Sequence, residues 1–521
     1  MGCAKNEVDS DHMRARLEAA GFEVESSSVR NLEADAGVGV GGAADGAERG
    51  AAAAEGGACG GDAACVPDAA CVPDVTIVNT CSFITGATQE SIDAVFAVID
   101  ERAEAAGRGL RMRDGGSKIV VAGCMPARYG EELESEIPEV DAFVGVEGEE
   151  SIVEVVRGLL DMGECGATCG ADGDVCATGD AARTTREPFA FVKISDGCDR
   201  FCSFCTIPYI RGRYKSRTAR QIVDEVEFLV HGGVREIVLI GQDTGVWGDD
   251  LRGREQIEPL PAATLPALLD YLAHAFPQTW IRVMYLQPER ISDELLGVMA
   301  GNANVCSYLD IPLQHASAKV ICEMNRAGSG QEYLELIEHV RSVVPDVTLR
   351  TTMIAGFPGE TDDEAAELED FMRDAVFDFA GVFEYSREDG TAAGERDDQV
   401  DPDLAIERAN AVREAIEECS VASAGARVGN VYDVLACGVV GIDDEFESDI
   451  DPAAGAGTGA DATAGDDAQQ PAARLWGRAM FQAPEVDSVV YFDAPPEAVG
   501  EFVKVKVVDA IGLDLEGELI G

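Results

Sequence analysis

The stretch Lys193–Arg217, KISDGCDRFCSFCTIPYIRGRYKSR, carries three closely spaced cysteines, Cys198, Cys202 and Cys205, in a C-x3-C-x2-C run. Three thiolates at this spacing can hold three irons of a [4Fe–4S] cluster and leave the fourth iron open for a chelating ligand. A structural zinc site and buried free thiols are the alternatives. Zinc usually takes a fourth protein ligand, and the next Cys or His along the chain is His231, so the spacing favours the cluster.

This run, with Phe204 directly before its last cysteine, resembles the signature of the radical S-adenosylmethionine (SAM) superfamily. In that superfamily the amino and carboxylate groups of SAM bind the open iron, and an aromatic side chain at the position of Phe204 lies near the adenine. The resemblance implies that the cofactors carry the difficult chemistry, while the protein positions them and excludes water.

The length and composition bound the class of protein. The chain has 521 residues, enough for two to four domains with sizeable cores. It contains no run of 18 apolar residues and no signal-peptide pattern, so we expect a soluble, cytoplasmic protein with no membrane partner. Sixteen cysteines in such a chain indicate metal or redox chemistry rather than a disulfide framework.

The charge is strongly acidic, with 40 Lys and Arg against 97 Asp and Glu and a net charge of −57. Broad, sequence-independent binding to nucleic acid depends on Lys and Arg that neutralise phosphates, so the composition argues against it. An acidic surface suits a basic protein partner. A general adaptation for solubility explains the same composition equally well.

An α/β pattern occupies the amino-terminal part of the chain. A helix is predicted from about Asp9 and another at 88–103, and short apolar runs predict strands at 75–78, 118–122 and 143–144. Strands that alternate with helices imply a parallel α/β sheet.

Three further cysteines lie at predicted loop positions in this part. Cys81 and Cys124 each follow a strand, at the carboxyl edge where open α/β sheets build their sites. Cys3 takes the equivalent place before the first helix, but no strand precedes it, so we hypothesise that the chain is truncated or wrongly started at Met1. Three cysteines on adjacent strand ends can converge on a second three-thiolate cluster site. Three unrelated buried cysteines are the alternative.

Three stretches rich in Ala, Gly and acidic residues interrupt the pattern. They lie at about 31–74, 161–186 and 441–473. Such sequences cannot bury enough apolar surface to offset the entropy of ordering, so we predict two disordered insertions and, at 161–186, a linker. The first two stretches contain six cysteines that we expect to be incidental: Cys59, Cys65, Cys71, Cys165, Cys169 and Cys176. A third metal site in the linker is the alternative for the last three.

From Pro188 to about Ser420 strands and helices alternate six times. The strands are predicted at 189–194, 235–240, 281–286, 306–311, 347–354 and 379–385, and the helices at 218–231, 263–275, 292–299, 331–343, 361–374 and 403–418. This pattern predicts a partial or full barrel of parallel strands, which places its chemistry at the carboxyl ends of the strands. Polar residues follow the other strands as they would in a cofactor site, although each could instead cap a helix or form a turn: Gln242–Thr244, Gln287–Arg290, Gln314–His315, Gly356–Glu360 and Tyr385–Ser386.

The last hundred residues change character. β-rich runs at 431–436, 474–481, 488–493 and 502–508 predict a small five-stranded barrel. Residues 421–521 contain 5 Lys and Arg against 19 Asp and Glu. Small barrels of this type often bind RNA through a basic face, whereas this charge favours a basic polypeptide.

The order of these motifs, GC, NTC, GC, the C-x3-C-x2-C run, a barrel and a small β-barrel, resembles the methylthiotransferases of the radical SAM superfamily. The resemblance covers nearly the whole chain except the insertions. It implies an amino-terminal domain at 1–160 that holds an auxiliary cluster, a linker at 161–186, a radical SAM barrel at 187–420 and a TRAM-like β-barrel at 421–521.

Two branches of that family differ in substrate. MiaB-like members modify an adenosine of transfer RNA, and RimO-like members modify an aspartate of the small-subunit ribosomal protein twelve. The segments GCAKNEVDS, GQDT, YLQPERISDEL, DIPLQHAS and APEVDSVVYF resemble the RimO-like branch, whereas YIRGRYKSR at 209–217 and MNR at 324–326 lean toward the transfer-RNA branch. The acidic terminal barrel favours the ribosomal protein, so we expect no transfer-RNA substrate.

The resemblance implies a concrete mechanism. Cys198, Cys202 and Cys205 would hold the cluster that, reduced by a donor such as flavodoxin or ferredoxin, splits SAM into methionine and a 5′-deoxyadenosyl radical. That radical would take a hydrogen from the β-carbon of the target aspartate. The auxiliary [4Fe–4S] cluster would carry the sulfur, which a first SAM methylates. Three cysteines would hold this second cluster: Cys3, Cys81 and Cys124. Four residues would contact SAM: Phe204, Gln242, Gln314 and Arg350.

Three other functions compete with this interpretation. A transfer-RNA methylthiotransferase would need a basic surface around its active face. A non-catalytic iron–sulfur scaffold or electron carrier would need neither polar residues at the strand ends nor an iron open to SAM. A plain SAM-dependent methyltransferase needs no cluster, so the cysteine run argues against it.

Overall fold

The computed structural model describes residues 3–25, 73–107, 116–161, 185, 187–251, 258–441 and 472–520. The chain divides into two compact units, unit 1 with Met1–Asn6, Arg16–Ser82 and Gly86–Ala177, and unit 2 with Glu7–Ala15, Phe83–Thr85 and Thr178–Gly521. Nearly all of the predicted insertions and linker, and the six cysteines within them, lie outside the described residues. None of the helices in these ranges is long and apolar enough to cross a membrane.

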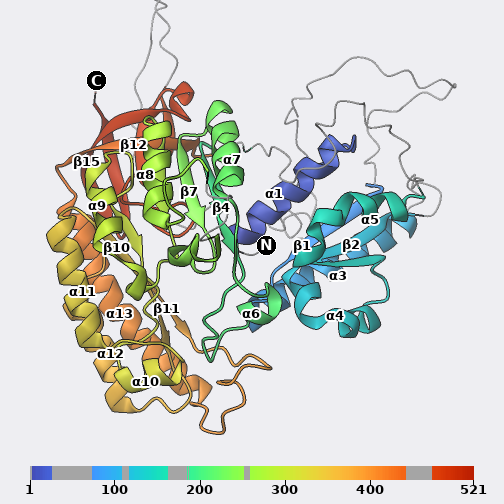
Figure 1. Cartoon of the computed structure of the whole chain (residues 1–521), viewed down its shortest axis with the longest axis horizontal. Coiled ribbons are helices and arrows are strands. Elements are labelled where there is room, and N and C mark those ends of the chain that lie inside the picture. The colour runs from blue at the N-terminus through green and yellow to red at the C-terminus, as the bar shows by residue number, and fades with distance from the viewer. Residues whose placement is uncertain are drawn as a thin grey trace, which may run out of the picture. The chain divides into compact units, whose positions relative to one another are not determined.

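Unit 1 contains a three-stranded parallel sheet in the order β1-β2-β3 (Figure 1). After Lys118 the central strand is apolar and buried on both faces, as parallel sheets require. Its elements are β1 (Val75–Thr80), α3 (Thr85–Gly107), β2 (Lys118–Gly123), α4 (Cys124–Glu136), β3 (Ala142–Gly145) and α5 (Ile152–Leu159). The predicted parallel α/β sheet is confirmed.

The first helix, α1 (Ala4–Ala19), begins directly after Cys3. The predicted start at about Asp9 was therefore wrong by more than one turn. The sequence pattern failed because Lys5 and Asn6 are polar and yet buried, so the first turn lacks the apolar periodicity that marks a packed helix.

Six parallel strands of unit 2 follow one another in chain order. They form two three-stranded sheets, β4-β7-β8 and β9-β10-β11, and a parallel bridge between Ile281 and Val305 joins them (Figure 1). The strands are β4 (Phe189–Lys193), β7 (Glu236–Ile240), β8 (Trp280–Val283), β9 (Tyr308–Asp310), β10 (Thr348–Ala355) and β11 (Phe379–Glu384). The predicted barrel is confirmed in its partial, open form.

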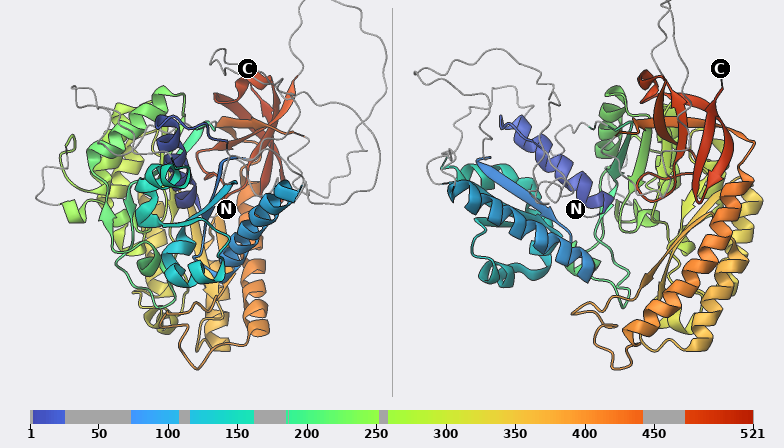
Figure 2. Two further views of the ribbon diagram at one scale, coloured as in Figure 1. Left: turned by 90° about the vertical axis from the view of Figure 1, so that its right-hand side faces the viewer. Right: turned by 180° about the vertical axis from the view of Figure 1, so that it is seen from behind.

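A helix follows most of these strands and packs its apolar face on them. In Figure 2, α11, α12 and α13 form a layer beside β10 and β11. Thr361 caps α12 and forms a reciprocal capping box with Glu364. The helices are α7 (Ala219–His231), α8 (Leu265–Ala275), α9 (Asp293–Gly301), α11 (Gly330–Val343), α12 (Asp362–Ala375) and α13 (Pro402–Ala426), with two short ones that were not predicted, α6 (Ile207–Ile210) and α10 (Ala318–Glu323).

The carboxyl-terminal part is a closed five-stranded barrel in the order β12-β13-β14-β16-β15. Its strands are β12 (Val431–Val439), β13 (Ala473–Ala479), β14 (Val490–Ala494), β15 (Phe502–Ile511) and β16 (Asp514–Leu519). The barrel was predicted, but β16 was not identified because half of its sequence, DLEGEL, is acidic. Gly517 is needed there, since a Cβ atom would lie 2.2 Å from Val505 Cγ1.

Buried charges join this small barrel to the amino ends of the parallel strands. Glu236, the first residue of β7, pairs with Arg282 at 2.7 Å and with Arg478 of β13 at 2.6 Å. Arg282 also donates to the backbone oxygen of Met480. The terminal barrel therefore covers the amino ends of the parallel strands. The cysteine run lies at the opposite, carboxyl ends.

Candidate functional site

In unit 1, two of the predicted cluster cysteines leave the sheet at neighbouring positions. Thr80 and Gly123, which end β1 and β2, are register partners, and Cys81 and Cys124 are the next residues along each strand. Gly123 has a φ of +94°, and a Cβ atom there would lie 2.2 Å from the Asn79 Oδ1. Only glycine permits this close crossing, so the sequence Gly-Cys brings Cys124 to the edge of the sheet beside Cys81.

The third cysteine is held near the same edge. Asn79 Nδ2 donates to the backbone oxygen of Asn6 at 2.9 Å, and the backbone N–H of Asn6 donates to the backbone oxygen of Cys3 at 2.8 Å. Ser91 brackets the Cys81 backbone, accepting from its N–H at 3.0 Å and donating to its C=O at 2.8 Å. Cys3 is exposed, whereas Cys81 and Cys124 are buried.

In unit 2, the cysteine run forms a tight loop after β4. The Cys198 amide donates to the Gly212 oxygen at 3.2 Å, and the Cys205 amide donates to the Cys202 oxygen at 3.0 Å. Gly197 has a φ of +71°, and a Cβ atom there would lie 2.3 Å from the backbone oxygen of Arg213. The loop therefore lies against the strand that returns from it, and glycine is required at the crossing.

The thiols of this loop are close enough to influence one another. Burial, together with the nearby charge of Cys202, raises the pKa of Cys198 to about 11 and that of Cys205 to about 12. Thiols shielded in this way become thiolates when a cation binds them. Among the described residues no set of three His, Cys, Asp or Glu side chains is already arranged around one metal position.

Beside the loop, the end of β7 presents polar atoms without partners. Both amide atoms of Gln242 and Oδ1 of Asp243 are shielded from solvent and form no hydrogen bond with any part of the chain that the structure describes. Arg200, from the cysteine loop, donates to the other oxygen of Asp243 at 2.5 Å and pairs with Glu289. A buried amide without partners costs stability unless a ligand satisfies it, so these polar atoms suit a polar cofactor such as SAM.

The other three predicted SAM contacts lie in different surroundings. Gln314 is half-buried at the end of β9 with a φ of +75°, and its backbone pairs with β10. Phe204 packs against a small apolar cluster that includes Met324 and Phe357. Arg350 lies near the amino end of β10 and pairs with Asp310 at 3.2 Å and Asp487 at 3.3 Å. All three stay predictions as SAM contacts, and the guanidinium of Arg350 already has two carboxylate partners.

The basic segment 209–217 is largely neutralised within the protein. Arg211, which is almost completely buried, pairs with Asp9 at 2.8 Å. Arg213 pairs with Asp199 at 3.1 Å. Arg217 likewise pairs with a carboxylate, that of Glu225, at 2.6 Å. These cations stabilise the path of the chain after the cysteine loop, which explains their presence without a nucleic-acid partner.

Sequence reasoning missed several residues that support the loop. Arg200 lies inside the cysteine run but was not singled out. Asn325 and Arg326 belong to the MNR segment, and Arg326 donates to Gln287 Oε1 at 2.5 Å and to the Pro312 oxygen at 2.8 Å. Their position directly after a short, unpredicted helix concealed their role.

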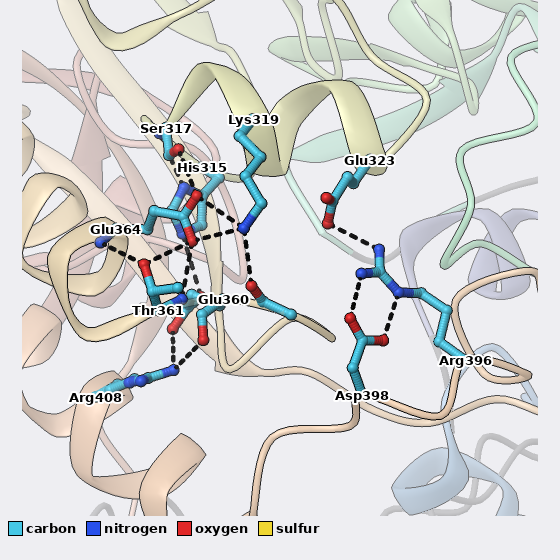
Figure 3. Close-up of polar contacts among 11 residues, drawn as sticks. His315, Ser317, Lys319, Glu323, Glu360, Thr361, Glu364, Arg396, Asp398 and Arg408 are labelled. Carbon is cyan, nitrogen blue, oxygen red and sulfur yellow. Dashed lines mark hydrogen bonds and ion pairs between the residues drawn. The ribbon is translucent and has the colours of Figure 1, made fainter.

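A buried polar network lies at the ends of β9 and β10 (Figure 3). His315 accepts at Nδ1 from the Ser317 amide at 3.0 Å, so the proton lies on Nε2, which donates to Glu360 at 3.2 Å. Arg408 of α13 donates to Glu360 at 3.0 Å. His315 and Glu360, predicted as part of the polar set, thus hold the loops at the ends of these strands.

The donor sets fit the predicted groups. Three cysteines in one loop with mutually interacting thiols suit three irons of a [4Fe–4S] cluster, and the unsatisfied amide of Gln242 suits a polar ligand beside it. In unit 1, the register of β1 and β2 provides two of the three thiols needed for a second cluster, with Cys3 held to the same edge by the Asn6–Asn79 bond.

Three family models match the chain. The Radical SAM superfamily model matches residues 192–372, the TRAM domain model matches 466–520, and the Uncharacterized protein family UPF0004 model matches 63–145. The UPF0004 model thus matches the part with the amino-terminal sheet, the Radical SAM model the partial barrel, and the TRAM model the small terminal barrel. The radical SAM match includes the whole cysteine loop, so a [4Fe–4S] cluster and SAM are the cofactors of this part of the chain.

Curated relatives match almost end to end, and those compared here are each named "Ribosomal protein uS12 methylthiotransferase RimO". The protein from Desulfitobacterium hafniense is 36% identical over 85% of this chain and 90% of its own. The proteins from Natranaerobius thermophilus and Desulfotalea psychrophila are 32% and 34% identical over 100% of this chain and 97% and 98% of theirs. Among solved structures, the radical SAM methyltransferase TsrM from Kitasatospora setae aligns with a TM-score of 0.44 at 15% identity, over 62% of this chain and 64% of that chain. The chain belongs to the RimO family of radical SAM methylthiotransferases.

Proposed function

We propose that this enzyme methylthiolates the β-carbon of an aspartate in the small-subunit ribosomal protein uS12. The observation that carries the proposal is the cysteine loop at the carboxyl end of the first barrel strand, in a chain that matches RimO relatives over nearly its whole length. The names of those relatives supply the substrate. The β-carbon C–H bond is too strong for acid–base chemistry, which is why a radical is needed.

Within unit 2, Cys198, Cys202 and Cys205 would hold one [4Fe–4S] cluster. When bound, the clusters supply the electron that cleaves SAM and the sulfur that is transferred. Gln242 would hydrogen-bond SAM through its buried amide, and we retain Phe204, Gln314 and Arg350 as further proposed contacts.

Within unit 1, Cys3, Cys81 and Cys124 would hold the auxiliary [4Fe–4S] cluster. The parallel register of β1 and β2 supports this assignment, because it brings two of the cysteines to the same edge of the sheet. The match of the UPF0004 model to residues 63–145, which include Cys81 and Cys124, is consistent with it. Cys3 completes the set only if its exposed thiol turns toward that edge.

Two observations favour a protein substrate over transfer RNA. The arginines of the 209–217 segment are paired with carboxylates. In the terminal barrel, Arg427, Arg474, Arg478 and Lys504 also pair with carboxylates. Phosphate binding needs Lys and Arg side chains that can neutralise the nucleic-acid backbone, and ribosomal proteins are basic, so the acidic chain suits uS12.

The remaining partners follow from this chemistry. Reductive cleavage of SAM needs one electron, so we propose a low-potential donor such as a flavodoxin or a ferredoxin. We also propose that the enzyme acts in the cytoplasm, where uS12 is made and assembled into ribosomes.

An anaerobic assay tests the proposal. Cluster-reconstituted protein would be mixed with SAM, a strong reductant, a uS12 peptide that spans the target aspartate and a transfer-RNA anticodon stem-loop. Mass spectrometry should find a methylthio group in place of one hydrogen on the peptide alone. A methylthio group on the RNA alone would overturn the substrate assignment.

A further inference from the structure

The Met-Asn-Arg segment at 324–326, which the sequence associates with an RNA-modifying branch, lies against the cysteine loop. It follows α10 (Ala318–Glu323) directly. The Ser203 amide donates to the Met324 oxygen at 3.0 Å, and the Ser203 hydroxyl donates to the Glu323 oxygen at 2.8 Å. Asn325 Nδ2 donates to the oxygens of Phe201 at 2.9 Å and Arg200 at 3.3 Å.

These four hydrogen bonds hold the residues on both sides of Cys202. Phe201 has a φ of +49° and Asn325 a φ of +57°, a left-handed conformation that asparagine adopts more readily than bulky residues do. For phenylalanine the conformation is strained and persists only when its surroundings impose it. The Asn325 amide, bonded to the Phe201 oxygen, is one such constraint.

Apolar contacts join the same two segments. Val320 and Met324 are buried in a small cluster with Phe357, and Phe204, the residue after Ser203, packs on it. The Ala393 amide donates to the Ser203 oxygen at 2.8 Å. The chain between Cys202 and Cys205 is thus held by polar contacts on its backbone and by an apolar contact on its side chain.

Ion pairs anchor α10 at both ends (Figure 3). At its start, Lys319 pairs with Glu364 at 3.1 Å. At its end, Glu323 pairs with Arg396 at 2.8 Å, and Arg396 pairs with Asp398 at 2.6 Å. A segment tied to α12 and to the chain after β11 can hold the loop in one place.

We infer that the turn 323–325 is a clamp on the cysteine loop and that Asn325, with Ser203, is a positioning residue for the cluster. The inference rests on the proposed assignment of Cys198, Cys202 and Cys205 to the cluster. The clamp fixes the backbone at Phe201 and Ser203, so that the Cys202 thiol is presented to the iron before the cluster is bound. Neither residue touches the reacting atoms.

Hydrogen exchange in the cluster-free, reduced full-length chain tests the clamp directly. Asn325→Asp keeps the size and the left-handed preference of the residue but removes both donors. In the double variant Ser203→Ala/Asn325→Asp, the backbone amides of the peptide 199–206 should exchange about tenfold faster than in the native chain. In Asn325→Asp alone the increase should be smaller. Because Asn325 is exposed, this change should cost the global fold little.

Asn304→Asp is the matched control. Asn304 Nδ2 donates to three backbone oxygens, those of Ala273, Phe276 and Thr279, each at 3.1 Å. The control variant Asn304→Asp should leave hydrogen exchange in the peptide 199–206 unchanged. Unchanged exchange there in the double variant, or an equal increase in the control, would overturn the clamp.

A second readout links the clamp to the cluster. After reconstitution and reduction, SAM should change the electron paramagnetic resonance spectrum of the native chain, and the change should be smaller or altered in the double variant at equal iron content. An identical change would overturn the positioning role. If the native chain itself shows no SAM-dependent change, the proposed function fails, while the exchange experiment still decides whether the clamp exists.

Discussion

Glu236 and Arg478 form an ion pair at 2.6 Å although they lie more than 200 residues apart and neither side chain is exposed by more than 1%. Arg282, which is equally buried, shares the same carboxylate. The pair joins the first residue of β7 to the terminal barrel. Two buried guanidinium groups thus depend on one carboxylate, so removal of Glu236 leaves both without their shared anion.

Replacement of this carboxylate should destabilise unit 2. Glu236→Gln leaves Arg282 and Arg478 without their anion, so the free energy of unfolding should fall by about 3–5 kcal/mol. Urea unfolding followed by circular dichroism measures it. Lys504→Ala removes one partner of an exposed pair with Asp433 and should cost at most about 1 kcal/mol. An equal loss in both variants would contradict the role assigned to the buried pair.

The amide of Gln242 should serve a ligand rather than the fold. Gln242→Leu removes polar atoms that have no partner in the described protein, so stability should stay equal or rise while SAM affinity falls about tenfold. Equilibrium dialysis with labelled SAM and urea unfolding give the two values.

Gln482 is the matched control for that substitution. Its buried amide accepts from the Ala479 N–H at 3.0 Å and donates to the Ser488 hydroxyl at 3.2 Å. Gln482→Leu should lower the free energy of unfolding by about 1–3 kcal/mol and leave SAM affinity unchanged. If Gln242→Leu lowered the free energy of unfolding without changing SAM affinity, and Gln482→Leu lowered SAM affinity instead, the assignment of Gln242 to SAM would be refuted.

Asp141 should make the stability of unit 1 depend on pH. Burial raises the pKa of this carboxyl, but the Ile119 amide, Lys118 and Arg102 outweigh burial, so the pKa lies below its ordinary value. A carboxyl whose pKa is lowered by folding stabilises the fold above its unfolded pKa of about 4, and the contribution is lost as the pH falls through the lower folded value.

Asp141→Asn should therefore differ most from the native chain near neutral pH. The difference in the free energy of unfolding should shrink as the pH falls from about 5 to 3, and urea titrations at several pH values measure it. A difference that stays constant over that range would show that Asp141 stabilises the sheet in a way that does not depend on its charge.

The two sets of cysteines should be separable by mutation. Cys202→Ala should abolish reductive cleavage of SAM and leave the auxiliary cluster in place. Cys81→Ala should leave SAM cleavage intact and block the transfer of sulfur. Chromatographic detection of 5′-deoxyadenosine and mass spectrometry of the peptide distinguish the two activities. If both variants lose both activities equally, the clusters do not have separate roles.

Much of the fold could be predicted because parallel strands buried on both faces read as continuous apolar runs. The run at 236–240 and its neighbours were located within a few residues. The Gly-Cys pair at 123–124 could be placed at a strand end for the same reason. Local spacing also places Cys198, Cys202 and Cys205 on one short loop, and their role as cluster ligands stays a prediction.

The remaining features depend on contacts between distant parts of the chain. No local pattern indicates that Glu236 meets Arg478 or that Asp9 pairs with Arg211. The role of Asn325 requires the path of the cysteine loop, more than 100 residues earlier. The basic segment 209–217 leans toward the transfer-RNA branch by sequence, and the carboxylates that pair with its arginines lie in other parts of the chain.

The most direct test of the central claim follows one hydrogen atom. A uS12 peptide carrying deuterium on the β-carbon of its target aspartate would be incubated anaerobically with reconstituted enzyme, SAM and reductant. The account predicts that one deuterium appears in 5′-deoxyadenosine and that the methylthiolated peptide has lost one. Retention of all the deuterium in a methylthiolated peptide, or unlabelled 5′-deoxyadenosine alongside it, would contradict radical chemistry at that carbon.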